Sequence, residues 1–359
     1  MARIGILNRN KILKLLRFGL YTSLIFAIIF YIDTNKFFWF QLVSGFIFGM
    51  IVGVLEELTN SRKFISFSLP LQYFLRISGF LFILSIVVVT PMLFYKNLSE
   101  INFEVIITHF KERRIMSILI SATLVTISVS TYFQIEKLVG KNMLSNYLRG
   151  RYRKPKKEIR VFLFMDLKSS TTLSEKLGNE TYYSFLNDAI YDMSQAIMET
   201  RAEIYQYVGD EIVFTWTLDK GITNNNCLRL YEKISEKLVN RKAYYLKNYG
   251  YQPQFKAAIH AGIVLAAEIG HIKKDIVYSG DVLNVTARME SLCNKYNAEI
   301  LISKSLFNLL ERKHEIIYED LGQMTLKGKD EKLELIKIHP SDSSYHKERK
   351  ELDKALKGN

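Results

Sequence analysis

Residues 161–171 read VFLFMDLKSST and decide the fold of the second half of the chain. The apolar run is typical of a buried strand, and Asp166 stands where that strand ends. Ser169, Ser170 and Thr171 favour the start of a helix, whose first backbone N–H groups can seat a phosphate beside the carboxylate. The stretch therefore predicts a strand leading into a helix, with a charged group exposed at the junction.

A second segment, residues 205–214, reads YQYVGDEIVF and predicts a hairpin whose turn contains Gly209 and Asp210. Two carboxylates at strand ends can hold a pair of divalent cations on a nucleoside triphosphate. Each aspartate alone is equally compatible with an ordinary role. Asp166 can stand beside a helix cap, and Asp210 is a common residue in a turn.

A third motif shifts the interpretation toward chemistry. Residues 280–290 read GDVLNVTARME, and a helix there places Asn284 and Arg288 four residues apart on one face. A guanidinium is suited to the charge that builds on a phosphate during displacement. The alternative is that both are ordinary residues of a solvated helix face.

The rest of the second half alternates between strand and helix patterns, which predicts an α+β sheet with helices packed on it. Helices are expected over 171–201, with a break near Gly178, and over 227–249 and 281–297. Strands are expected over 158–166, 203–217 (a hairpin), 255–270 (a hairpin or a bent strand), 276–279, 299–303, 315–320 and 333–338.

The first half has the composition of a membrane domain. Uncharged, mostly apolar stretches run over 18–32, 37–55, 77–95 and 115–135. At about 1.5 Å per residue the last three can cross a hydrocarbon core of about 30 Å, and the first can if Arg17 extends to the headgroups. We therefore expect four spanning helices; a cleaved signal peptide is the alternative for the first.

Charge predicts the orientation of these spans. Residues 1–160 contain 22 Lys and Arg against 8 Asp and Glu, and 17 of these basic residues fall on the side of both termini against 5 on the other. The positive-inside bias places both termini and the second half in the cytoplasm. The basic cluster over 149–160 follows the last span, so membrane lipids are its expected partner and nucleic acid is not. Two cysteines fit a reducing cytosol.

The second half resembles the class III nucleotidyl cyclases, the adenylate and guanylate cyclase catalytic domain. The matching segments are 164–167 with Thr171, 208–211, Gly280-Asp281 with Asn284 and Arg288, and the LKGK sequence of 326–329. The resemblance implies a ferredoxin-like core sheet with helices. The expected organisation is a four-span transmembrane region over 1–135, a basic linker over 136–156, a cyclase catalytic domain over 157–339 and a polar tail over 340–359. Such a membrane-anchored single domain is typical of bacterial members, which implies a bacterial-type cytoplasmic membrane.

The resemblance also implies roles for the matching residues. Asp166, Asp210 and the carbonyl of Leu167 would bind two Mg²⁺ or Mn²⁺ ions, and the product would be a 3′,5′-cyclic nucleotide with pyrophosphate. Further implied contacts are Asn284 with the ribose, Arg288 with the α-phosphate and Lys327 with the triphosphate, although Lys327 can also be a solvated loop lysine. Sites in this family form between two domains arranged head to tail, which implies a homodimer.

The sequence defines the nucleobase of the substrate less well than the reaction. Where the family commonly reads adenine with a lysine and an aspartate, this chain has Gln206 and Val277, and valine offers no hydrogen bond. ATP is favoured by its frequency in the family, while GTP and pyrimidine substrates stay open. Two other readings also remain: a catalytically silent cyclase-like domain that binds nucleotide, and a diguanylate cyclase, which shares the VGDE hairpin but lacks the downstream Asn and Arg.

Overall fold

In the computed structural model the described residues are 39–58, 67–95, 143–311, 313–325 and 332–339, with Phe64, Gly140 and scattered residues between 12 and 31 and between 120 and 138. The chain divides into two compact units, and the boundary lies between Val139 and Gly140. The predicted polar tail over 340–359 lies outside the described residues.

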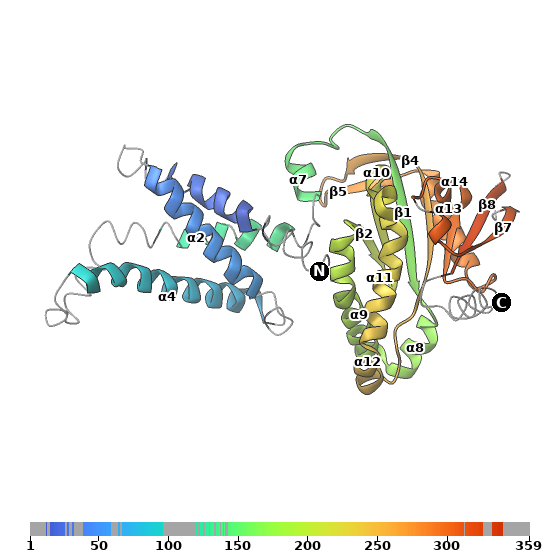
Figure 1. The fold of residues 1–359 in the computed structure, drawn as a ribbon, viewed down its shortest axis with the longest axis horizontal. Helices are drawn as coiled ribbons and strands as arrows, with labels where there is room; N and C mark the ends of the chain where they lie inside the picture. Colours follow the sequence, from blue (N-terminus) through green and yellow to red (C-terminus); the bar gives the residue numbers. More distant parts are fainter. Residues whose placement is uncertain are drawn as a thin grey trace, which may run out of the picture. The chain divides into compact units, whose positions relative to one another are not determined.

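The first unit is helical (Figure 1), with α2 over Trp39–Leu58 and α4 over Leu69–Tyr95. Polar groups are buried in it: the Thr22 hydroxyl donates to the Gly45 carbonyl at 2.7 Å, and Arg76 is 6% exposed. Among the residues described here, no helix has both the length and the apolar character needed to cross a membrane. The prediction of four transmembrane helices therefore finds no support in this unit.

The second unit is built on one sheet, which contains eight strands in the described part of the chain. Their order is β2-β3-β1-β4-β6-β8-β7, and β5 pairs with β4 beside this path. The strands are β1 (Lys156–Leu167), β2 (Glu203–Val208), β3 (Glu211–Thr217), β4 (Phe255–Ile269), β5 (Asp275–Ser279), β6 (Ile300–Ser303), β7 (Tyr318–Thr325) and β8 (Lys332–Ile338).

Helices connect and cover these strands. They are α7 (Met143–Leu148), α8 (Ser170–Leu177), α9 (Asn179–Glu199), α10 (Leu218–Ile222), α11 (Asn226–Asn240), α12 (Lys242–Tyr249), α13 (Asp281–Leu292) and α14 (Lys304–Phe307), with 3-10 turns at Thr223–Asn225 and Lys313–Glu315. The run β1–α9–β2–β3–α11–β4 has the spatial order β2-β3-β1-β4, with every neighbouring pair antiparallel. This is the ferredoxin-like arrangement, so the predicted α+β core is confirmed.

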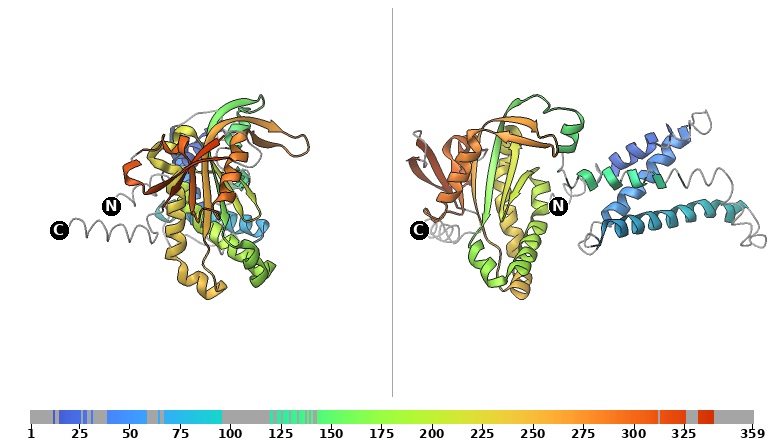
Figure 2. Two further views of the ribbon diagram at one scale, coloured as in Figure 1. Left: turned by 90° about the vertical axis from the view of Figure 1, so that its right-hand side faces the viewer. Right: turned by 180° about the vertical axis from the view of Figure 1, so that it is seen from behind.

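The strand β1 is buried on both faces, because side chains alternate across a sheet. Val161, Leu163 and Met165 pack into the main core with α8, α9 and α11. Phe162 and Phe164 lie on the other face, in a cluster that includes Val282 of α13, and the two helix layers are visible in Figure 2. Asp166 is the next residue on the α13 face, which gives the strand end its charged group.

Three predicted boundaries are wrong. The helix expected over 227–249 is divided into α11 and α12 at Arg241, whose φ of −104° and ψ of 13° leave the helical range. The helix expected over 281–297 ends at Leu292, and the chain then turns through Asn297 with a φ of 45°. The strand expected over 315–320 begins later, because a 3-10 turn occupies Lys313–Glu315.

Candidate active site

Asp166 lies at the open end of β1 and is directly opposite Lys256 of β4 in the strand register. Its side chain is 23% exposed, and its Oδ2 lies 3.3 Å from the Lys256 Nζ. The same ammonium group lies 2.9 Å from Oε1 of Glu290, a buried residue of α13. One lysine therefore joins a carboxylate of the sheet to a carboxylate of the helix that covers it.

Asp210 reaches the same place from the hairpin between β2 and β3. Val208 pairs with Glu211, so Gly209 and Asp210 form the two-residue turn, and Gly209 takes a φ of 64° that favours glycine. The Oδ2 of Asp210 is buried and has no hydrogen-bond partner among the described groups. The hairpin thus delivers a carboxylate beside Asp166 and leaves one of its oxygens unsatisfied.

The electrostatics show that carboxylates are crowded here. Burial raises the pKa of Asp166 to about 6, and a hydrogen bond with Asp210 and the negative charges of Glu290 and Asp210 add to this effect. Burial likewise raises the pKa of Glu211 to about 7, with the charges of Glu290, Asp166 and Asp210 acting in the same direction. Burial lowers the pKa of Lys256, but the Glu290 and Asp166 carboxylates outweigh it and the net shift is upward. The cluster has more negative charge than Lys256 balances.

The predicted phosphate seat lies next to the two aspartates. Ser169 has a left-handed φ of 58° and its side chain caps no backbone group, and α8 begins at Ser170. The backbone N–H groups of the first helical turn, including those of Ser170 and Thr171, have no partner inside a helix by its geometry. Leu167 is buried at the end of β1, so its backbone reaches the same junction.

Asn284 and Arg288 do not join this cluster within one chain. The buried residues of α13 are Val282, Val285, Thr286, Met289 and Glu290. Asn284 is exposed and Arg288 half-buried on the other side of the helix. The contacts of Asp166 in the described structure are to Lys256, Asp210 and Glu290. The residues predicted to act on ribose and α-phosphate therefore project away from the aspartates of their own chain.

The two positions predicted to read the base lie on different strands. Gln206 is exposed on β2 opposite Val213, just after an irregularity in the register, and Val277 is half-buried on β5 opposite Ala267. Lys327 and the rest of the LKGK segment fall outside the described residues.

Three residues of the cluster were missed by sequence reasoning: Lys256, Glu290 and Glu211. Lys256 is a charge inside the apolar strand 255–269, which is a signal, because an unpaired lysine is rarely buried in a sheet. Glu290 and Glu211 sit beside quoted motif residues, but only the packing of α13 on β1 and β4 brings Glu290 to Asp166.

The donor set fits a magnesium or manganese ion. No group of three or more His, Cys, Asp or Glu side chains in the described part of the chain is arranged to hold a metal. The predicted donors are two carboxylates and a backbone carbonyl, and oxygen ligands of this kind, completed by water and phosphate, suit Mg²⁺. The unsatisfied Asp210 oxygen and the raised pKa of Asp166 are the features that a cation between the carboxylates would relieve.

Residues 152–338 match the family described as the adenylate and guanylate cyclase catalytic domain. The chain belongs to this family. It is 35% identical over 223 residues to adenylate cyclase 2 of Rhizobium meliloti (strain 1021), which covers 62% of this chain and 61% of that protein. It is 28% identical over 186 residues to an adenylate cyclase of Anabaena cylindrica, which covers 50% of this chain and 36% of the relative.

The match therefore spans less than two thirds of the length of these relatives. Among solved structures, a bacterial light-regulated adenylyl cyclase aligns with a TM-score of 0.54 at 17% identity, over 64% of this chain and 67% of that one. At this identity the similarity concerns the fold of the cyclase domain.

The crowded carboxylates predict how stability depends on pH. Asp166 and Glu211 have a higher pKa in the folded chain, so the folded state loses stability as pH rises from about 4 through about 7. Without divalent ions, Asp166→Asn should raise the free energy of unfolding by about 1–2 kcal/mol near pH 8 and leave it unchanged near pH 4. Thermal unfolding of the full chain at the two pH values measures this.

Asp219→Asn, in α10 and outside the cluster, is the control and should show no such pH dependence. Added Mn²⁺ should stabilise the wild type near pH 8 more than the Asp166→Asn variant. Equal stability of variant and wild type at both pH values would contradict the account of the cluster.

Proposed function

We propose that the chain is a nucleotidyl cyclase, which converts a nucleoside triphosphate to a 3′,5′-cyclic nucleotide and pyrophosphate in signalling. The observation that carries this proposal is that Asp166 and Asp210 lie together at the end of β1. One Asp210 oxygen there has no hydrogen-bond partner among the described groups, and the pKa of Asp166 is raised. Membership of the cyclase family supports it.

In this mechanism the ribose 3′-hydroxyl releases its proton to solvent and its oxygen attacks the α-phosphorus, the bond from that phosphorus to the bridging oxygen breaks, and pyrophosphate leaves. Asp166, Asp210 and the Leu167 carbonyl would hold two Mg²⁺ or Mn²⁺ ions, which when bound would lower the pKa of the 3′-hydroxyl and neutralise charge on the triphosphate. Lys256 orients Asp166 through the contact of 3.3 Å. Ser169, Ser170 and Thr171 offer backbone N–H groups to phosphate oxygens.

The remaining groups come from a second chain. Arg288 stabilises the charge on the α-phosphate, Asn284 orients the ribose and Lys327 contacts the triphosphate. What supports two chains is the outward face of α13, where Asn284 and Arg288 lie on the side opposite Glu290 and Asp166. The active form is thus a head-to-tail homodimer with two sites.

ATP is the proposed substrate. The curated relatives are named adenylate cyclases, which supports this choice. Gln206 and Val277 are the proposed base contacts, and Gln206 can hydrogen-bond to either purine. GTP and pyrimidine triphosphates are the competing substrates.

The first prediction concerns the reaction. The full chain, purified with Mn²⁺ and each of the four ribonucleoside triphosphates, should release pyrophosphate and a cyclic nucleotide, most rapidly from ATP. Chromatography of the products measures this. Nucleotide binding without any cyclic product would instead identify a catalytically silent cyclase-like domain, and a dinucleotide product would identify a diguanylate cyclase.

The divided site makes a separate prediction. Asp210→Ala and Arg288→Ala chains should each lose activity by about 10²-fold or more, since each loses a group that acts in the transition state. Mixed together they should recover activity, because a heterodimer contains one site with both groups intact. Dimers that form without recovering activity would exclude the head-to-tail assignment.

We also propose that the protein is an integral protein of a bacterial-type cytoplasmic membrane, with the cyclase domain and both termini in the cytoplasm. The support is the four apolar stretches and the positive-inside charge bias of the sequence. Expressed in bacteria, the chain should sediment with membranes, resist extraction at alkaline pH and be released by detergent. Recovery in the high-speed supernatant without detergent would overturn this proposal.

A further inference from the structure

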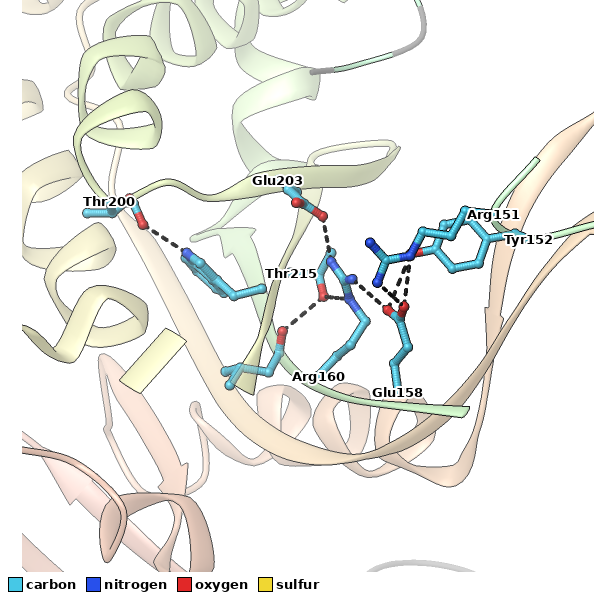
Figure 3. A network of polar contacts seen from close by, with 9 residues as sticks. Arg151, Tyr152, Glu158, Arg160, Thr200, Glu203 and Thr215 are labelled. Atoms are coloured by element: carbon cyan, nitrogen blue, oxygen red, sulfur yellow. Dashed lines mark hydrogen bonds and ion pairs between the residues drawn. The ribbon is translucent and has the colours of Figure 1, made fainter. Parts of the chain in front are cut away.

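A buried arginine, Arg160, stands in the first half of β1, six residues before Asp166. Arg160 is 2% exposed, and three of its nitrogens donate hydrogen bonds to three different side chains (Figure 3). Nε donates to Thr215 Oγ1 at 3.0 Å, one terminal nitrogen to Glu158 Oε2 at 3.1 Å and the other to Glu203 Oε2 at 2.5 Å. The guanidinium fork thereby ties β1 to β3 and to the start of β2.

Arg160 also contacts β5 through an aromatic ring. Its guanidinium carbon lies 4.6 Å from the centre of the Tyr278 ring, a cation–π distance. The Tyr278 ring lies 5.1 Å from that of Tyr205, and the Tyr278 backbone N–H donates to the Tyr205 hydroxyl at 3.4 Å. Because β2 pairs with β3 and β5 with β4, these side chains link β2 to β5, together with Phe162, whose ring centre lies 6.3 Å from that of Tyr205 and 5.8 Å from that of Tyr278.

The joined residues are sequence neighbours of the two proposed base contacts. Gln206 follows Tyr205 on β2, and Val277 precedes Tyr278 on β5. We propose that Arg160 is a positioning residue for base selection, which holds β2 and β5 at a fixed separation so that Gln206 and Val277 act on the same base. This inference rests on the proposed cyclase function and adds a residue that touches no substrate.

The chemistry of the group suits this role. A buried guanidinium flanked by two carboxylates is held in one geometry, because its planar donors fit only one arrangement of acceptors. Thr215 is itself fixed, since its hydroxyl donates to the Val161 carbonyl at 3.0 Å. Burial raises the pKa of Glu158, but the hydrogen bond and charge of Arg160 outweigh it and keep the carboxylate ionised. The four contacts thus form a rigid support rather than a mobile surface pair.

The support is separate from the proposed metal site. Arg160 and Asp166 are six residues apart on one strand, about 20 Å at about 3.3 Å per residue. The contacts of Asp166 are to Lys256, Asp210 and Glu290, none of which touches Arg160. Loss of Arg160 should therefore change the choice of base without changing the dependence on divalent ions.

A matched control lies next to the network. Arg151 donates to the other oxygen of Glu158, Oε1, at 2.9 Å, but its side chain is 42% exposed. Its guanidinium carbon lies 5.5 Å from the centre of the Tyr152 ring. Arg151→Met removes an arginine from the same glutamate while β2 and β5 stay joined.

The experiment compares kcat/KM for ATP and for GTP, in the full-length protein with saturating Mn²⁺. Arg160→Met should move the ratio of the two values about tenfold toward equality, mainly through a higher KM for the preferred nucleotide. The Mn²⁺ concentration for half-maximal activity should stay at the wild-type value. Arg151→Met should retain the wild-type ratio, and Arg160→Lys should recover part of it.

A second variant keeps the test valid if Arg160→Met folds poorly. The triple variant Arg160→Met, Glu158→Gln, Glu203→Gln also neutralises the two carboxylates that lose the Arg160 guanidinium, and it should regain thermal stability. If discrimination returns with stability, Arg160 is merely structural and the inference is wrong. If the triple variant is stable and still selects poorly, the inference is supported.

Gln206→Ala separates this inference from the proposed function. An altered ATP-to-GTP ratio in Gln206→Ala with a wild-type ratio in Arg160→Met overturns the inference alone. An unaltered ratio in Gln206→Ala overturns the assignment of the base contact and the inference with it. A wild-type chain that makes no cyclic nucleotide overturns the proposed function as well.

Discussion

The strand β1 is covered on both faces, and its register determines the face on which Arg160 and Asp166 lie. Val161, Leu163 and Met165 fill the core under α9 and α11, so the intervening residues must face α13. A shift of one residue would move the Asp166 carboxylate into the main apolar core, which is why the register is strongly specified. The period of two thus places Arg160 and Asp166 on one face, six residues apart along the strand.

The two ends differ in charge balance. At the Arg160 end, the Arg160 guanidinium donates to the carboxylates of Glu158 and Glu203, and Arg151 donates to Glu158 as well, so that two positive charges face two negative ones. At the Asp166 end, the Lys256 ammonium lies among four carboxylates, those of Asp166, Asp210, Glu211 and Glu290. One Asp210 oxygen accepts no hydrogen bond from the described residues. A balanced network is suited to rigidity, whereas an excess of negative charge is suited to holding cations. The same strand therefore supports a fixed end and a binding end.

Local patterns were enough to predict the elements and the two aspartates. Asp166 follows an apolar run and Asp210 follows a glycine in a turn, and both signals lie within a few residues of sequence. The contact between Lys256 and Glu290 was not predictable, because the two residues are more than thirty positions apart in the chain. They meet only because α13 packs against β1 and β4. Predicted helix boundaries were wrong where a single residue, such as Arg241, has backbone angles outside the helical range.

Asn284 and Arg288 lie on the side of α13 that faces away from Asp166 of the same chain. Their spacing on a helix was predictable, and the face on which they lie follows from the buried set Val282, Val285 and Met289.

The N-terminal end of α13 cannot rotate freely. A Cβ on Gly280 would lie 2.7 Å from the Ile263 carbonyl oxygen, so the helix begins in close contact with β4. With Glu290 held by Lys256 at the other end, turning Arg288 toward Asp166 of the same chain would break both contacts. A site that needs all of these groups is therefore reached more readily by bringing in a second chain than by rearranging α13.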